Sequence, residues 1–213
     1  QPGKKHILTL KVNAVPLKDV ITAYSDTNMG RQVQATVARR GICGDVFIRS
    51  IPGGACINHV AVETSFRKGE ITFKTGLASL EPGKKYRLSF LISFKGTGVA
   101  SFMSRTFTSS DLDGNHFIHN EKWIPEKLWD THTPENIHKA EVSLLDASGK
   151  NADIFIPVNF GYREFWIEGR DFYLNGSRIW LSCIPLDNAQ SGVAMASYGE
   201  AKVSLLRLKS TGI

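Results

Sequence analysis

The sequence has 213 residues, of which 42% are hydrophobic and 22% are charged, as is typical of a soluble globular protein. No apolar run approaches the roughly 20 residues needed to cross a bilayer, and no signal peptide precedes Gln1, so we expect a soluble chain with no membrane partner and any export signal upstream. The net charge of +6 comes from 26 basic and 20 acidic residues that are scattered along the chain, which argues against a nucleic-acid partner.

Three cysteines, Cys43, Cys56 and Cys183, are too few and too widely spaced for a disulfide framework or a CxxC metal site. Cys43 and Cys56 would pair only if two strands brought their Cα atoms within about 7 Å. Otherwise all three are small buried hydrophobic residues. The sequence therefore predicts no metal centre and no cofactor, and it leaves the compartment open.

The first 50 residues contain three segments with strand patterns. Residues 4–12 alternate apolar side chains with lysines and a threonine, and Pro16 ends this pattern. Residues 32–37 and 46–48 predict two further strands. Three strands are few for a complete domain.

From Asn58 onward, strand patterns follow one another at regular intervals. Turns are indicated at Lys68-Gly69, at residues 80–83 and at residues 146–149. The expected strands lie at residues 59–67, 70–77, 84–94, 101–108, 138–145 and 154–159. Short strands at this spacing, with almost no helical periodicity, predict an immunoglobulin-like β-sandwich at about residues 51–163.

A hairpin is predicted directly after this sandwich. Between Phe165 and Leu174, apolar side chains alternate with polar or differently facing neighbours, as in strands that pack on one face. The dipeptide Asn175-Gly176 accepts positive φ at both positions, which favours a two-residue type I′ turn. The chain should then return as an apolar strand at residues 177–183.

The C-terminal segment predicts one helix. Ser197 and Glu200 have the spacing of a capping box, and Ala201, Leu205 and Leu208 fall on one helical face. Gly212 is suited to end the helix. Together with the preceding strand, this segment predicts one β/α unit.

Two tryptophans, Trp123 and Trp129, lie in a segment that also contains Pro125 and Pro134. An aromatic face can stack on the apolar face of a sugar ring, so the two indoles are candidates for a sugar platform. The alternative is that they hold an irregular loop against the sandwich, since the prolines are typical of such a strap.

Four segments resemble glycoside hydrolase family 2, whose members include β-galactosidases, β-glucuronidases and β-mannosidases. Residues 160–163 (Phe-Gly-Tyr-Arg) and 169–176 (Gly-Arg-Asp-Phe-Tyr-Leu-Asn-Gly) are similar to the family's junction between a sandwich and a catalytic barrel. Residues 123–135 are similar to its Trp/Pro segment, and residues 41–48 resemble the last strands of its jelly-roll domain.

The resemblance implies a mainly β chain of three parts. Residues 1–50 would be the C-terminal strands of an incomplete jelly-roll sugar-binding domain, and residues 51–163 the immunoglobulin-like sandwich. Residues 164–213 would be the hairpin and the first β/α unit of an incomplete (β/α)8 barrel, which needs eight such units. The implied partners are the remaining jelly-roll and barrel segments of the same chain and the carbohydrate substrate of the parent enzyme.

In this family two glutamates on later barrel strands carry out a retaining hydrolysis. The resemblance therefore implies no catalytic residue in this chain and no glycosidase activity on its own. Asn120-Glu121 mimics the family's acid/base pair, but it lies upstream of the barrel, in the predicted sandwich.

The loop after the expected barrel strand is the remaining candidate for substrate binding. It reads Leu-Ser-Cys-Ile-Pro where the family has Leu-Arg-Gly-Val-Asn, which puts transfer of the family's sugar specificity in doubt. Asp187, Asn188 and Gln190 could bind sugar hydroxyls in an intact barrel, at the carboxyl end of a strand. Equally, Asp and Asn are common loop residues.

Two further patterns suggest metal sites only weakly. Asp111 to Asn115 has alternating oxygen donors and a glycine, but it lacks the remaining ligands of a calcium loop and also fits an ordinary turn. His116 and His119 are three residues apart, and in extended chain they would face opposite sides.

Two functions remain open on the sequence alone. The first is a non-catalytic supporting region of a family 2-like glycoside hydrolase. The second is a stand-alone β-sandwich that binds carbohydrate or protein. Residues 197–213 discriminate between the two, because a free binding module has no need of an isolated capped β/α unit.

Overall fold

The structure is a computed structural model that describes residues 5, 7–12, 42, 45–47, 50–181 and 197–212. Residues Arg49–Leu181 form one compact unit, while helix α3 (Tyr198–Ser210) belongs to a second unit. Within the described part of the chain, no helix is both long and apolar enough to cross a membrane.

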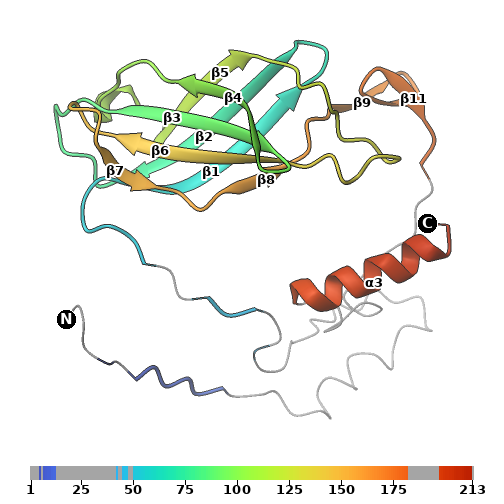
Figure 1. The fold of residues 1–213 in the computed structure, drawn as a ribbon, viewed down its shortest axis with the longest axis horizontal. Coiled ribbons are helices and arrows are strands. Elements are labelled where there is room, and N and C mark those ends of the chain that lie inside the picture. Colours follow the sequence, from blue (N-terminus) through green and yellow to red (C-terminus); the bar gives the residue numbers. More distant parts are fainter. Residues whose placement is uncertain are drawn as a thin grey trace, which may run out of the picture. The chain divides into compact units, whose positions relative to one another are not determined.

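The fold is mainly β, with three antiparallel sheets (Figure 1). The first sheet has the strand order β1-β2-β5, and the second has the order β4-β3-β6-β7, with β8 also paired to β6. The third is a small sheet of order β11-β10-β9. The strands are β1 (Cys56–Ser65), β2 (Glu70–Ala78), β3 (Arg87–Phe94), β4 (Thr97–Met103), β5 (His116–Lys122), β6 (His138–Leu145), β7 (Asn151–Ile154), β8 (Val158–Phe160), β9 (Phe165–Glu168), β10 (Asp171–Leu174) and β11 (Ser177–Ile179).

The first two sheets pack face to face, and we refer to them as the sandwich. Every second residue of the central strands is buried, as expected where one face of each sheet meets the other. The residues that form this core include Ile71, Phe73 and Leu77 of β2, Leu88, Phe90 and Ile92 of β3, and Ala140, Val142 and Leu144 of β6. The predicted sandwich core is therefore present.

Aromatic rings connect the two sheets across this core. Phe73 of β2 stacks on Phe90 of β3 with ring centroids 4.2 Å apart. Phe117 of β5 stacks on Phe107, which follows β4, at the same distance. Such offset pairs contribute about 0.5–1.5 kcal/mol beyond the area that they bury. The four rings therefore fix the spacing of the sheets.

Most predicted strands of the sandwich are confirmed, but three regions differ. The strand predicted at residues 101–108 is displaced: β4 spans Thr97–Met103, so residues 104–108 lie outside it. Residues 116–122 form β5, where the sequence predicted a polar loop, because only Phe117 of this strand is fully buried and its pattern is weak. Residues 154–159 do not form one strand: the chain runs as β7 and β8, which pair with different parts of β6. The segment between them contains Pro157.

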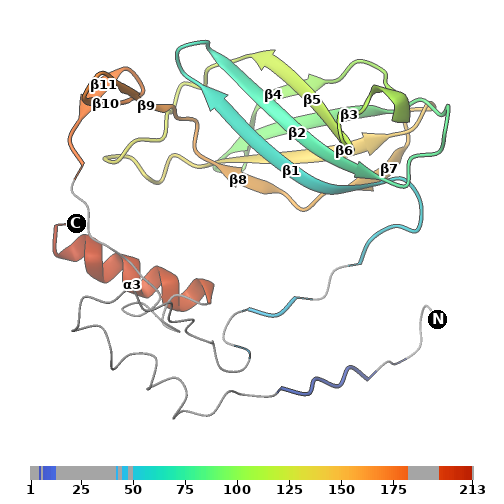
Figure 2. The ribbon, with the colours of Figure 1, turned by 180° about the vertical axis from the view of Figure 1, so that it is seen from behind.

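The predicted hairpin turn is confirmed. Asn175 and Gly176 have φ values of 49° and 85°, and Leu174 pairs with Ser177 across the turn. Figure 1 and Figure 2 both show β9, β10 and β11 at one end of the sandwich. The last strand is shorter than predicted, because β11 ends at Ile179 and pairs antiparallel with β10. The described residues therefore do not show a barrel strand here.

Helix α3 has the predicted ends. Its N-cap residue Ser197 accepts a hydrogen bond from the backbone N–H of Glu200 at 3.3 Å, and Gly212 has a φ of 86°. None of its described residues is buried. Of the strand predicted at residues 4–12, residues 5 and 7–12 are described, and they form no strand. The loop before α3, the strand predicted at residues 32–37 and most of the predicted jelly-roll region lie outside the described residues. Neither the jelly roll nor the β/α unit is therefore shown.

Candidate functional site

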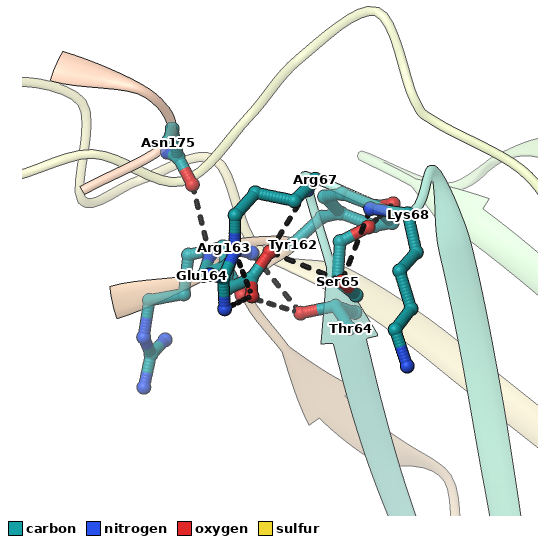
Figure 3. A network of polar contacts seen from close by, with 8 residues as sticks. All are labelled: Thr64, Ser65, Arg67, Lys68, Tyr162, Arg163, Glu164 and Asn175. Atoms are coloured by element: carbon teal, nitrogen blue, oxygen red, sulfur yellow. Dashed lines mark hydrogen bonds and ion pairs between the residues drawn. The ribbon is translucent and has the colours of Figure 1, made fainter. Parts of the chain in front are cut away.

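Three segments that are distant in sequence meet where the hairpin joins the sandwich. They are the turn between β1 and β2, the connection between β8 and β9, and the hairpin turn (Figure 3). The residues that bond one another there are Thr64, Ser65, Arg67, Lys68, Tyr162, Arg163, Glu164 and Asn175. We call this set the junction.

Tyr162 anchors the junction in the sandwich core. Its side chain is fully buried, and its hydroxyl shares its proton between the backbone carbonyls of Ser65 (3.0 Å) and Glu70 (3.1 Å). These two carbonyls belong to the ends of β1 and β2. Burial, reinforced by the nearby carboxylates of Glu164 and Glu70, raises the pKa of Tyr162 to about 12. The hydroxyl therefore stays protonated and remains a donor at any physiological pH.

Thr64 fixes the backbone of Arg163, the residue that follows Tyr162. Its hydroxyl donates to the carbonyl of Arg163 at 2.6 Å and accepts from the N–H of Arg163 at 3.2 Å. The residues are 99 positions apart in the sequence. The Thr64 side chain of β1 thus satisfies both the backbone N–H and the backbone carbonyl of Arg163.

Glu164 receives the largest number of hydrogen bonds in the junction. One carboxylate oxygen accepts from the hydroxyl of Ser65 (3.0 Å) and from the backbone N–H of Arg67 (2.8 Å), and the other accepts from the Arg67 guanidinium, with Nε at 2.8 Å. Burial raises the pKa of Glu164, but the bonds from Arg67 and Ser65 outweigh burial and leave it below its usual value. Glu164 is therefore a carboxylate at neutral pH.

Asn175 links the hairpin turn to two other segments. Its side-chain oxygen accepts from the backbone N–H of Glu164 at 2.9 Å, and its side-chain nitrogen donates to the carbonyl of Trp129 at 2.8 Å. Its own N–H donates to the carbonyl of Glu164 at 3.0 Å. Asn175 therefore serves both as a turn residue with positive φ and as a bridge between the connection and the tryptophan segment.

Trp129 packs closely against the same connection. A Cβ atom on Gly161 would lie 2.6 Å from Cβ of Trp129, so only glycine fits at that position. The guanidinium of Arg163 lies 4.5 Å from the centre of the Trp129 ring, and the backbone N–H of Trp129 donates to the carbonyl of Tyr162. These contacts are those of the strap that the sequence allowed, with Arg163 covering one indole face.

The small hairpin sheet has one anchored face and one exposed face. On the anchored face, Trp166 stacks on Tyr173 with centroids 5.4 Å apart, and the guanidinium of Arg67 lies 4.6 Å from the Trp166 ring. On the other face, Phe165 and Ile167 are exposed, with 62% of Ile167 accessible, whereas Leu174, which pairs with Phe165, is buried. The cation–π contact connects the sandwich turn to the sheet.

Trp123 is not itself a member of the junction, but its ring contacts that of the junction residue Tyr162. The two rings meet at 79° with centroids 5.7 Å apart. Trp123 is half-buried, and with Pro125 and His138 it lines a pocket of about 350 Å³. Whether Trp123 or Trp129 binds sugar stays a prediction.

The other predicted site residues cannot be placed. Asp187, Asn188 and Gln190 lie outside the described residues, as do Cys43 and Cys183. Cys56 is buried and unbridged, as the sequence allowed.

The possible calcium loop is occupied by local contacts. Asp111 accepts from the backbone N–H of Thr108 at 2.8 Å and from Arg105 at 2.9 Å, and these bonds lower its pKa to about 2. In the part of the chain that the structure describes, no three His, Cys, Asp or Glu side chains are grouped as metal ligands would be.

A larger hollow of about 710 Å³ lies at the start of the sandwich, among residues 52–55, 81–86 and 146–152. Charged side chains line it, but Lys84 pairs with Glu81 at 2.6 Å, and Asp146 accepts hydrogen bonds within its own turn. One ion pair and one turn within the hollow's own lining therefore engage Lys84, Glu81 and Asp146.

The polar members of the junction were not predicted from the sequence. Residues 160–163 and Asn175-Gly176 were recognisable, but no role was assigned to Thr64, Arg67 or Glu164. Thr64 and Arg67 lie in or beside a turn between two strands, where polar residues are common and predict no particular contact. Their partners in the junction are almost 100 positions away in the sequence. The position of Glu164 directly after the Phe-Gly-Tyr-Arg motif was the one available signal.

No protein-family model matches the chain, and no curated protein sequence matches it significantly. Its structure is similar to part of a Bacteroides fragilis protein assigned as a β-galactosidase, with 22% identity over 59% of this chain and 20% of that one and a TM-score of 0.44. It is also similar to β-glucuronidase 3 of Bacteroides uniformis, with 22% identity over 60% of this chain and 15% of that one and a TM-score of 0.42. For a family 2 β-galacturonidase of Eisenbergiella tayi, the identity is 20% over 59% of this chain and 22% of that one, with a TM-score of 0.41. The chain therefore spans about a fifth of the length of these glycoside hydrolases, and it resembles them over about 60% of its own length.

Proposed function

We propose that this chain is a non-catalytic supporting region of a family 2-like glycoside hydrolase. In this proposal the sandwich is immunoglobulin-like, and the N-terminal 50 residues are the C-terminal strands of an incomplete jelly-roll domain. The segment after the hairpin begins a (β/α)8 barrel. The parent enzyme would hydrolyse glycosidic bonds of carbohydrates by a retaining mechanism, with two carboxyl groups about 5 Å apart on later barrel strands.

The junction is the observation that carries this proposal. A linker between independent domains has few contacts, whereas here Tyr162, Glu164 and Asn175 bind the hairpin to the sandwich through buried or directional bonds. The chain leaves the hairpin at Leu181, two residues after β11. A hairpin fixed in this way can hold the start of a following domain in a set orientation.

The exposed residues of the hairpin support the same role. Trp180 is 81% accessible and Leu181 is exposed, and Phe165 and Ile167 are exposed on the face away from the anchoring stack. Large apolar side chains gathered on a small sheet are typical of a surface that another part of a protein covers. In the proposal, the barrel of the parent enzyme covers them.

The proposal is tested first on the gene. The reading frame should continue beyond codon 213 into a (β/α)8 barrel with two glutamates at the carboxyl ends of its strands. A stop codon directly after codon 213 would overturn it. Hydrolysis of nitrophenyl glycosides by the 213-residue chain would contradict the expectation that this region is inactive alone.

The supporting role has its own test on the chain itself. Residual dipolar couplings measured on amides of β1–β8 and of β9–β11 should fit one alignment tensor, because the junction makes them one body. Asn175→Gly keeps the turn conformation but removes both side-chain bonds, and it should reduce the couplings of β9–β11 selectively. Couplings of the hairpin that are already averaged in the unmodified chain would contradict this role.

A further inference from the structure

The pocket beside Trp123 lies within the sandwich and has no part in the junction. It has a volume of about 350 Å³ and lies between the turn of β3 and β4 and the segment 123–127. This volume is at the lower end of the range of about 300–1,000 Å³ for small-molecule sites. There is room for one ring-sized ligand.

Two aromatic rings line this pocket beside a histidine. The Phe94 and Trp123 centroids are 5.0 Å and 5.7 Å from that of His138. Three described rings contact Trp123, and they meet it at 73°, 88° and 79°. None of these rings stacks flat on the indole. Trp129 differs, because Arg163 lies over its ring.

His138 gives the pocket a polar group that the described residues leave unsatisfied. The side chain is 1% exposed, and its Nδ1 has no hydrogen-bond partner among them. Leaving a buried polar atom without a partner is unfavourable. Burial also lowers the pKa of His138, so the ring is neutral at pH 7 and offers one donor and one acceptor nitrogen. Hydroxyl groups, which both donate and accept, complement such a ring.

Charged side chains stand at the rim of the pocket. Glu126 and Lys127 line it, and both are exposed. They pair with each other at 3.4 Å, so the rim is polar without favouring an ion of either sign. The pocket thus combines apolar aromatic walls, one neutral polar group within and a polar rim.

We propose that this pocket binds a single pyranose ring of a carbohydrate, with Trp123 packed on the apolar face of the ring and His138 bonded to a hydroxyl. A pyranose has apolar C–H faces and a polar edge, which match these walls and this imidazole. A phenylalanine side chain of a peptide would fill the walls but leave the imidazole without a partner. The site does not depend on the proposed function, because every residue that lines it belongs to the sandwich.

The test is an NMR titration of the 213-residue chain with methyl glucoside, galactoside, mannoside and glucuronide. At least one sugar should give saturable shifts at the Trp123 indole N–H and the amides of residues 124–127, with no shift at Trp129. His138→Phe retains the ring packing and should weaken binding about tenfold, the equivalent of one hydrogen bond of about 1.4 kcal/mol. Trp123→Ala should abolish it.

Trp180→Ala is the matched control, because Trp180 is highly exposed and lies outside the pocket. The Trp180→Ala variant should bind the sugar with the same affinity as the unmodified chain. If Trp123→Ala does not fold, the His138→Phe result decides. The proposal is overturned if no pyranoside shifts these resonances at tens of millimolar, if His138→Phe binds unchanged, or if a tryptophan-containing peptide binds where sugars do not.

Discussion

The sandwich and its hairpin are held together by different forces. Stacked rings such as Phe73 on Phe90 hold the sandwich, and they are buried in its apolar core. Directional bonds to Glu164 and Asn175 hold the hairpin in place. The core therefore determines whether the unit folds, whereas the junction determines how the hairpin is oriented on it. Selective changes should separate these two roles.

Phe73→Ala should have the largest effect. It removes a fully buried ring and its stack on Phe90, and comparable truncations cost about 3–5 kcal/mol. Urea unfolding should show a lower midpoint, with β1–β8 and β9–β11 lost in one transition, because the hairpin has no core of its own. Phe73→Leu, which keeps most of the apolar volume, is the control and should cost less. A hairpin that stays ordered after the sandwich unfolds would refute this comparison.

Asn175→Gly should loosen the hairpin and leave the core intact. Glycine accepts the φ of 49°, so the loss comes from two side-chain bonds, about 1–2 kcal/mol in total. Hydrogen exchange of the Glu164 amide should accelerate about tenfold, while amides of β2 and β3 are unaffected. Asn175→Ala loses the same bonds and adds about 1 kcal/mol of strain at positive φ. Equal effects of the two substitutions would show that the turn conformation is not strained.

Acid should weaken the junction before the core. The pKa of Glu164 lies below its unfolded value of about 4.3, so the folded state gains stability from it above that pH. As the pH falls below about 4.3, the Glu164 carboxylate of the unfolded chain is protonated before that of the folded chain. Stability therefore decreases until the pH has passed the lower pKa of the folded state. Exchange of hairpin amides at different pH values measures the loss. Glu164→Gln is the control, and its hairpin should show no pH dependence in that window.

Arg178→Ala should have the smallest effect. Arg178 pairs with Asp171 at 2.7 Å and lies over Trp180, but all these groups are partly exposed. Exposed ion pairs contribute about 0–1 kcal/mol, so we expect a change near 0.5 kcal/mol in urea unfolding and no change in hairpin orientation. A loss as large as that of Asn175→Gly would mean that the pair belongs to the anchoring contacts.

Local chemistry made much of the fold predictable. Gly69, with its φ of 63°, and the Asn175-Gly176 turn occur where their residue types require, and β6 spans the predicted residues. The same holds for Ser197 at the start of α3. Each of these features is decided by residues within a few positions of one another, so a local pattern contains the necessary information.

Other features were not predictable, because distant partners decide them. Strand β5 contains His119, Asn120 and Glu121, and its polar pattern resembles a loop; its pairing with β2 is what makes it a strand. The pocket beside Trp123 depends on His138, which joins it from another strand. Local periodicity identifies neither β2 as the partner of β5 nor His138 as the neighbour of Trp123.

The sequence alone determined where strands alternate, where the hairpin turns and that Trp123 and Trp129 belong to one proline-containing segment. Tertiary structure decided what those residues do. It covered one face of Trp129 with Arg163, placed Trp123 beside an unsatisfied histidine and gave the turn residue Asn175 a second role as a bridge. The physical reason is range: backbone preferences act over a few residues, whereas hydrogen bonds and ring contacts form between any residues that folding brings together.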